Sequence, residues 1–249
     1  MENVLLIIMA GLVAGAMNAL AGGGSFVTLP VLIAVGVPSV AANVSSTVAL
    51  YPGGLASAWV YWSGPRPVGR IPLMTIAAVT LAGGLIGSAV LLSTPPSLFD
   101  HILPWLLLLA TVALALGPRL SGAVHRQVPR GPGILLTGQF LLGIYGGYFG
   151  GAVGIMMMAF WSVTVGADLK SLQAPRTALV TVANTAAVVY FALAGAVQWG
   201  TVALMAPAAV AGGFAGAQVG RKLRPAHIRF ATIALASFVT CMFFARAYG

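Results

Sequence analysis

The sequence predicts an all-α, polytopic integral membrane protein. Of its 249 residues, 59% are apolar and only 6% are charged, with a mean hydropathy of +1.01, whereas a soluble globular domain carries roughly 25% charged residues. Long apolar runs follow one another along the whole chain. Glycine is frequent, at 32 residues, which in a membrane chain indicates close helix packing or helix breaks. The composition therefore excludes a water-soluble enzyme and a disordered chain.

The basic balance of the chain indicates orientation in a bilayer. The net charge of +9 comes from 12 Lys and Arg against 3 Asp and Glu. Such a balance can indicate a nucleic-acid partner, but these basic residues are few and scattered among apolar runs. We therefore expect no nucleic-acid partner, and interpret the basic residues as signals that orient the chain in a lipid bilayer.

Ten apolar segments are expected to form helices, and they account for most of the chain. In order, they are 4–21, 26–37, 40–62, 71–92, 102–117, 134–149, 153–165, 172–195, 201–220 and 228–245. Crossing a hydrocarbon core of ~30 Å takes about 20 residues. Segments 40–62, 71–92, 172–195 and 201–220 are long enough, although Pro52-Gly53-Gly54 predicts a break in the first of them.

Segments 26–37 and 153–165 are too short to span comfortably, and each directly follows a glycine run. The runs are Gly22-Gly23-Gly24 and Gly150-Gly151. Short, glycine-interrupted segments at matching places in two halves point to broken helices, or re-entrant ones, around a transporter binding site. A helix that resumes at Ser25 or after Gly151 exposes backbone N–H groups and a positive dipole end, which suit an anion. The alternative is a loop that serves close packing only.

Two glycine patterns recur at nearly the same offset. The stretch 15–24 matches 143–152 at an offset of 128, and Gly83-Gly84-x-x-Gly87 matches Gly212-Gly213-x-x-Gly216 at an offset of 129. We predict one transmembrane domain, 1–249, made of two repeats, about 3–120 and about 131–249. Five hydrophobic elements in each half is an odd number, so the second repeat is expected to be inverted relative to the first, as in alternating-access carriers.

The loops between these segments predict the topology. Basic residues occur in alternate loops, which lie on one side of the membrane. The loops on the opposite side contain Asp100 and no Lys or Arg. The basic set is Arg66, Arg70, Arg119, Arg126, Arg130, Lys170, Arg221, Lys222 and Arg224. By the positive-inside rule this side faces the cytoplasm. We therefore expect a multi-pass protein of the inner (plasma) membrane, with both termini on the non-cytoplasmic side.

Arg176 is the basic residue that loop charge does not explain. It lies inside segment 172–195, after Pro175, and a cation at the centre of a bilayer costs about 2.5–3.5 kcal/mol. We interpret Arg176 as a cation that coordinates an anionic substrate. The alternative is a side chain that extends from the helix end to water.

Polar residues within other segments complete the predicted substrate site. Asn43-Val-Ser45-Ser46-Thr47 aligns with Gln173-Ala-Pro-Arg176-Thr177, although Ser and Thr side chains also bond carbonyls of their own helix. Asn184 lies on one face with Thr181, and Asn18 precedes the first glycine run; either amide could instead join helices. The predicted substrate-binding residues are Asn18, Gly22, Gly23, Gly24, Ser25, Ser45, Ser46, Thr47, Gly150, Gly151, Arg176, Thr177 and Asn184.

Acidic residues are missing from the apolar segments. The three acids, Glu2, Asp100 and Asp168, fall in termini or loops, so no carboxylate is expected in the membrane to relay a proton or bind a cation. Nothing activates Ser25 as a nucleophile, because no His or acid accompanies it. We expect no catalytic residue, no metal and no cofactor, and therefore not an enzyme.

The sequence resembles the sulfite exporter TauE/SafE family over nearly the whole chain. The resemblance is carried by Asn18-Ala-Leu-Ala-Gly-Gly-Gly-Ser25 with Pro30, and by its echo Gly147-Tyr-Phe-Gly150-Gly151. Further matches are Gly36-Val-Pro38 and Gly195-Ala-Val-Gln-Trp199. The family often has an Asn followed by Lys where this chain reads Ala174-Pro175-Arg176, which keeps a cation and loses the amide. The resemblance implies transport of sulfur-containing anions such as sulfite or sulfonates.

Together these patterns predict a membrane transporter, most simply an exporter, of small anions. Sulfite or an organosulfonate is the expected substrate, bound at the midplane between the two glycine-rich breaks. Two alternatives stay open. One is a carrier of a neutral or cationic metabolite that uses the Ser, Thr and Asn side chains alone, and the other is a membrane scaffold without a substrate.

Overall fold

A computed structural model describes residues 2–249 apart from 62–63, 65–66, 124–130, 166–171 and 221–224. In this part the chain forms helices and a single isolated bridge between Val68 and Ile71, with no β-strand. The all-α prediction is therefore confirmed. The helices are α1 (Glu2–Ala21), α2 (Ser25–Ala34), α3 (Ser39–Tyr61), α4 (Leu73–Ser93), α5 (Pro96–Ala123), α6 (Pro132–Tyr148), α7 (Val153–Thr164), α8 (Gln173–Leu193), α9 (Trp199–Gly220) and α10 (Pro225–Tyr248).

Each predicted segment corresponds to one helix, with one notable difference in length. Helix α5 begins at Pro96, six residues before the predicted segment 102–117, and continues to Ala123. Asp100 and His101 therefore lie in the helix rather than in a loop. The early start has a local cause, since Pro96 occupies the first helical position, where its missing N–H costs nothing, and Phe99 N donates to Pro95 O at 3.0 Å.

The predicted break at Pro52-Gly53-Gly54 is wrong, because α3 continues through it to Tyr61. A proline inside a membrane helix is tolerated where neighbouring helices satisfy the backbone groups it frees. Thr181 of α8 contacts this part of α3, since its Oγ1 donates to Gly54 O, two residues after the proline, at 3.5 Å. Pro52, Gly53 and Gly54 therefore lie inside a continuous helix rather than in a loop.

Six of the helices are long and apolar enough to cross a membrane, among the residues that the structure describes. They correspond to α1, α4, α5, α8, α9 and α10, while α2 and α7 are shorter apolar helices. Helix α3 has 23 residues but lies outside this group, since Asn43–Thr47 and Pro52–Gly54 make it more polar. These features confirm a multi-pass membrane protein.

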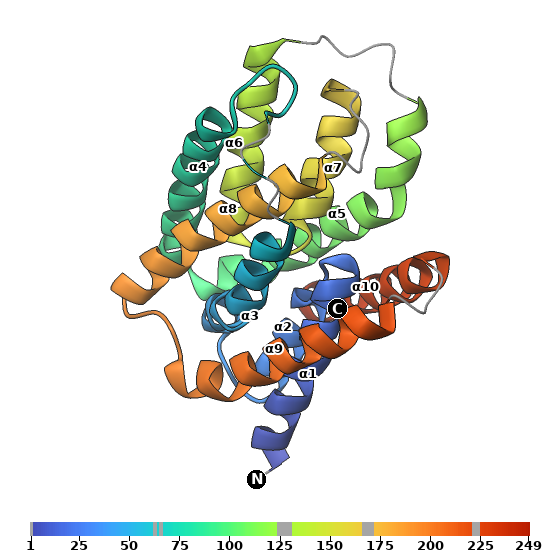
Figure 1. Cartoon of the computed structure of the whole chain (residues 1–249). Helices are drawn as coiled ribbons and strands as arrows, with labels where there is room; N and C mark the ends of the chain where they lie inside the picture. Colours follow the sequence, from blue (N-terminus) through green and yellow to red (C-terminus); the bar gives the residue numbers. More distant parts are fainter. Residues whose placement is uncertain (1, 62–63, 65–66, 124–130, 166–171, 221–224) are drawn as a thin grey trace.

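Two pairs of helices cross at glycines. Helix α1 packs against α9, and α4 packs against α6 (Figure 1). A Cβ added to Gly15 would lie 1.9 Å from Ala209 O, and one added to Gly87 would lie 2.0 Å from Ile144 O. These backbones approach as closely as small-residue packing allows, and Gly212 packs in the same way, with an added Cβ 1.9 Å from Leu12 O.

The contacts between helices follow a pattern that exchanges the two halves of the chain. By order in each half, α1 corresponds to α6 and α9 corresponds to α4. The contact of α1 with α9 therefore corresponds to a contact of α6 with α4, and both contacts are present. The pairs α3–α8 and α5–α10 map onto themselves, and both are present as well. Helices α3 and α8 meet near the centre of the molecule (Figure 1), and this pair holds the candidate site.

Candidate functional site

A cavity of about 100 Å³ lies between α3 and α8 at the point where α1, α2 and α7 end or begin. Its volume is well above the ~10–15 Å³ that one water needs, so it can hold a small ion. Its lining is rich in polar side chains and carries one charged residue, Arg176, among the described residues. The lining residues are Asn18, Gly22, Ser25, Thr47, Leu50, Gly54, Gly150, Ala152, Val153, Gly154, Ile155, Arg176, Thr177, Val180, Thr181 and Asn184.

Two short helices begin at this cavity. Helix α2 begins at Ser25 and α7 at Val153, both of which line it, and neither helix has a side-chain cap. The first hydrogen-bonded amides are those of Phe26, which donates to Gly23 O at 3.1 Å, and Ile155, which donates to Ala152 O at 2.9 Å. The N–H groups before them have no helical partner and carry the positive ends of two helix dipoles. The arrangement favours an anion.

Equivalent glycines shape the two breaks that precede these helices. Gly22 and Gly150 both have φ of +75°. Gly22 N donates to Met17 O at 3.2 Å and Gly150 N to Tyr145 O at 3.3 Å, so each glycine ends the preceding helix in the same way. A left-handed backbone favours glycine at both positions. Ala152, the residue before α7, also has a positive φ, of 57°. Helix α7 therefore begins directly after a residue in the left-handed conformation.

Arg176 extends from α8 to the beginning of α7. It lies in the first turn of α8, is half-buried and lines the cavity. A Cβ added to Gly154 would lie 3.3 Å from Arg176 Nε, so the side chain lies against the first turn of α7, where a glycine leaves room for it. The cationic group therefore faces the same space as the two helix dipoles.

The polar run of α3 divides between packing and the cavity. Thr47 lines the cavity. Ser45 Oγ accepts from Gln198 N at 3.2 Å, and Ser46 Oγ forms a short hydrogen bond with Thr28 Oγ1. Asn43, which is 2% exposed, donates from Nδ2 to Tyr148 O at 2.9 Å. Three of the four polar side chains thus join α3 to other parts of the fold.

The structure brings together eight of the predicted site residues around one cavity: Asn18, Gly22, Ser25, Thr47, Gly150, Arg176, Thr177 and Asn184. The other five, Gly23, Gly24, Ser45, Ser46 and Gly151, do not line it. Gly24 has a packing role instead, since an added Cβ would lie 2.8 Å from Ala14 O. Gly151 is buried, next to the ring of Phe149.

Sequence reasoning missed the residues that form the first turn of α7 and an apolar part of the lining. These are Leu50, Gly54, Ala152, Val153, Gly154, Ile155 and Val180. The predicted helix start after Gly151 was a usable signal for 152–155, because a cavity at a helix start is lined by the first turn itself. Nothing in the sequence distinguishes Leu50 or Val180 from other apolar helix residues.

Within the described residues, the basic loop residues and the possible metal ligands, His, Cys, Asp and Glu, do not line this cavity, whose one charged side chain is Arg176. Among the described residues, no group of three His, Cys, Asp or Glu side chains could hold a metal. Several predicted loop residues lie outside the described part of the chain: Arg66, Arg126, Arg130, Asp168, Lys170, Arg221, Lys222 and Arg224. Arg229 of α10 is described, and its Nη2 donates to Ala115 O of α5 at 2.8 Å, which is a structural contact.

The comparisons with known proteins agree with a membrane transporter. The model of the sulfite exporter TauE/SafE family matches residues 7–243. A "probable membrane transporter protein" of Haemophilus influenzae is 28% identical over 226 residues, covering 89% of this chain and 85% of that protein. The "probable membrane transporter protein YfcA" of Escherichia coli K12 is 28% identical over 213 residues, covering 85% and 77%. None of the solved structures matches.

Proposed function

The chain belongs to the sulfite exporter TauE/SafE family of membrane transporters, and we propose that it carries a small anion, sulfite or an organosulfonate, out of the cell. The substrate binds in the cavity between α3 and α8. One observation carries the proposal: Arg176 and the starts of α2 and α7 face one cavity whose described lining holds no Asp or Glu. Three positive elements around a space without a carboxylate suit an anion.

Each element of the site has a separate role in this proposal. Arg176 supplies the full charge and a planar set of N–H donors that match an oxyanion. Ser25 and Val153 mark the helix starts whose N–H groups point into the site. Gly22 and Gly150 set the backbone directions of the breaks. Five of the predicted residues do not line the cavity, so we restrict the proposed binding set to the eight that do.

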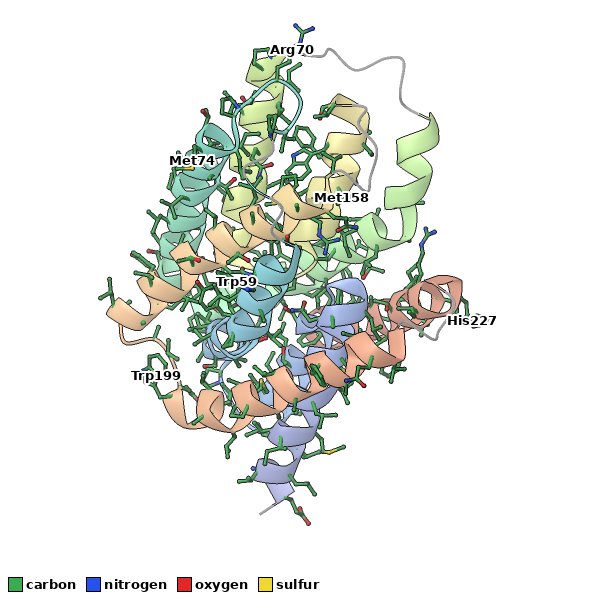
Figure 2. The ribbon with its side chains drawn as sticks, viewed as in Figure 1. Trp59, Arg70, Met74, Met158, Trp199 and His227 are labelled. Carbon is green, nitrogen blue, oxygen red and sulfur yellow. The ribbon has the colours of Figure 1, made fainter. Side chains whose placement is uncertain are left out.

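The orientation of the chain is part of the proposal. The basic loops, of which Arg70 is a described and exposed member, face the cytoplasm by the positive-inside rule. Arg70 and the N-terminus lie at opposite ends of the molecule in the common view of Figures 1 and 2, which supports opposite sides of the inner membrane for them. Both termini then lie on the non-cytoplasmic side.

Ligand-induced stabilisation of the purified protein tests the proposal. A ligand at 100 times its Kd stabilises the folded state by about 2.7 kcal/mol, so sulfite or a sulfonate should raise the Tm and a neutral sulfoxide of similar size should not. Arg176→Ala should abolish the shift. Arg176→Lys should keep part of it, because the charge remains while the planar donor set is lost.

A matched control separates the site from general charge effects. Arg70→Gln also removes one positive charge, but at the periphery of the molecule (Figure 2), and should leave the shift intact. A Tm that no anion changes would contradict the proposal. An undiminished shift in Arg176→Ala would leave anion binding but place it elsewhere, and a shift with neutral solutes alone would favour a carrier of neutral metabolites.

A further inference from the structure

The cavity offers hydrogen-bond donors to a ligand. The starts of α2 and α7 contribute backbone N–H groups, and Arg176 contributes a guanidinium that has donors and no acceptor. These groups come from Ser25, Val153, Gly154 and Arg176, all of which line the cavity. They are suited to the negatively charged oxygens of a ligand.

The threonines that line the cavity offer mainly acceptors. Thr47 Oγ1 donates to Asn43 O at 2.9 Å, Thr177 Oγ1 donates to Ala174 O at 3.0 Å, and Thr181 Oγ1 donates to Gly54 O at 3.5 Å. A hydroxyl group has one hydrogen and two lone pairs. Because each hydrogen is directed to a backbone carbonyl, the lone pairs are what remains for a ligand.

Asn184 adds an acceptor to the same region. Its Oδ1 is buried and has no hydrogen-bond partner in the described part of the chain. A Cβ added to Gly150 would lie 3.8 Å from Asn184 Oδ1 and 3.5 Å from Thr47 Oγ1, so both oxygens lie beside the second glycine break. A buried acceptor without a donor destabilises a protein, and a ligand that brings a donor removes that penalty.

We propose that the preferred substrate is a singly charged oxyanion that also carries its own hydrogen-bond donor. The inference rests on the proposed function and narrows it to one class of anion. The charged oxygens face Arg176 and the helix starts, while the donor faces Asn184 and Thr47. Protonated inorganic oxyanions such as hydrogen sulfite belong to this class, and so do hydroxyalkyl sulfonates. Sulfate carries no donor, so it would set its lone pairs against those of Asn184 and Thr47.

An isosteric pair of sulfonates tests this preference on the purified full chain. 2-Hydroxyethanesulfonate and 1-propanesulfonate have the same charge and nearly the same shape, and differ by a hydroxyl in place of a methyl group. We expect the hydroxy compound to bind about tenfold more tightly, the ratio that corresponds to one buried hydrogen bond. A second experiment compares the Kd of hydrogen sulfite, at weakly acidic pH, with the Kd of sulfate. It shows whether the preference for a hydrogen-bond donor extends from organic sulfonates to inorganic anions.

Two isosteric variants locate the acceptors. Asn184→Leu and Thr47→Val should each reduce the tenfold preference to about twofold or less, because the hydroxyl of 2-hydroxyethanesulfonate loses its acceptor. Arg176→Gln should weaken both sulfonates alike and keep their ratio. Thr47→Val removes only a hydroxyl, so it keeps the test usable if Asn184→Leu does not fold.

The outcomes separate this inference from the proposed function. If the wild type binds both sulfonates equally and does not prefer hydrogen sulfite over sulfate, the inference is overturned while anion binding stands. If the preference survives in both variants, its assignment to Asn184 and Thr47 is overturned. If no sulfonate and no sulfite binds, the proposed function itself fails.

Discussion

The hydroxyl oxygens of Thr111 and Thr240 lie 3.0 Å apart, joining α5 to α10 although the two residues are 129 positions apart. The same offset separates Gly83 from Gly212, so equivalent positions of the two halves contact each other. A two-fold axis that exchanges two halves brings equivalent positions together, whereas a simple translation does not. The contact therefore supports the proposal of repeats at about 3–120 and 131–249, related by an axis that passes between these threonines.

We predict that Thr111→Cys with Thr240→Cys forms a disulfide under mild oxidation in a Cys241→Ala background. The two hydroxyl oxygens already occupy the positions that the sulfurs would take, within reach of disulfide geometry. Mass spectrometry of the linked peptides measures it. The matched control is Thr111→Cys alone with native Cys241, which follows position 240 but is exposed and should stay free. Equal cross-linking in the control would contradict the proposed axis.

Cysteine accessibility tests the predicted topology. In a Cys241→Ala background, Gly249→Cys should react with a membrane-impermeant maleimide added outside intact cells, because the C-terminus is proposed to be non-cytoplasmic. Arg70→Cys should react only after the membrane is opened, since Arg70 belongs to the basic set that the positive-inside rule places in the cytoplasm. The reverse labelling pattern would show that the orientation is inverted.

Membrane voltage should drive anion efflux without a pH gradient. The described lining of the cavity has no carboxylate to relay a proton, and a potential that is negative inside contributes about 2.3 kcal/mol per charge per 100 mV to outward movement of an anion. In proteoliposomes whose voltage is clamped, the flux of 2-hydroxyethanesulfonate, whose charge does not change near neutral pH, should follow the voltage and respond little to a pH gradient. Flux that strictly requires a pH gradient at clamped voltage would contradict this prediction.

How far the sequence determines this fold depends on whether the controlling interaction is local. Apolar length and proline or glycine breaks are local, so the helix start at Ser25 and the all-α class could be predicted from the chain alone. The continuation of α3 through Pro52 could not, because a proline followed by two glycines resembles a break locally, whereas α3 is a continuous helix packed against α8 and α9. The extra turns at the start of α5 were missed because Asp100 and His101 interrupt the apolar pattern while Pro96 still starts a helix.

The candidate site shows the same division. Arg176 and Gly150 could be selected because a cation and a repeated glycine are unusual within an apolar segment. Ser45 and Ser46 were equally unusual, yet they face Gln198 and Thr28. Which side of α3 faces the cavity is decided by how α3 is rotated against its neighbours. That rotation is a property of the packed helices, and a single sequence does not display it.

Alanine at Gly15 should destabilise the crossing of α1 and α9. An added Cβ would lie 1.9 Å from Ala209 O, so the helices must separate, and overpacking of this kind typically costs about 1–3 kcal/mol. Thermal unfolding in detergent measures the change. Gly133→Ala is the matched control, because Gly133 is also helical but has nothing within 4 Å of an added Cβ; it should be neutral or slightly stabilising. Equal losses in both variants would show that the crossing is not the cause.

Alanine at Gly22 should act through the backbone alone. Gly22 has φ of +75° and nothing within 4 Å of an added Cβ, so the cost of substitution is the left-handed conformation itself, about 1–2 kcal/mol. We expect Gly22→Ala to lower the Tm and to raise the Kd for the anion, because the start of α2 is tied to this break. Gly150→Ala has the same φ of +75° and should also lower the Tm and raise the Kd, although its Cβ would in addition contact Thr47 Oγ1 at 3.5 Å.

The neighbouring residue provides the control for this last prediction. Gly23 has no positive φ, and the nearest atom to an added Cβ is Thr232 Cγ2 at 3.4 Å, an ordinary contact. Gly23→Ala should therefore change neither the Tm nor the Kd by much, although it lies in the same glycine run. If Gly23→Ala were as damaging as Gly22→Ala, the run would need small side chains throughout. The left-handed geometry of Gly22 and Gly150 would then not be what positions the two helix starts.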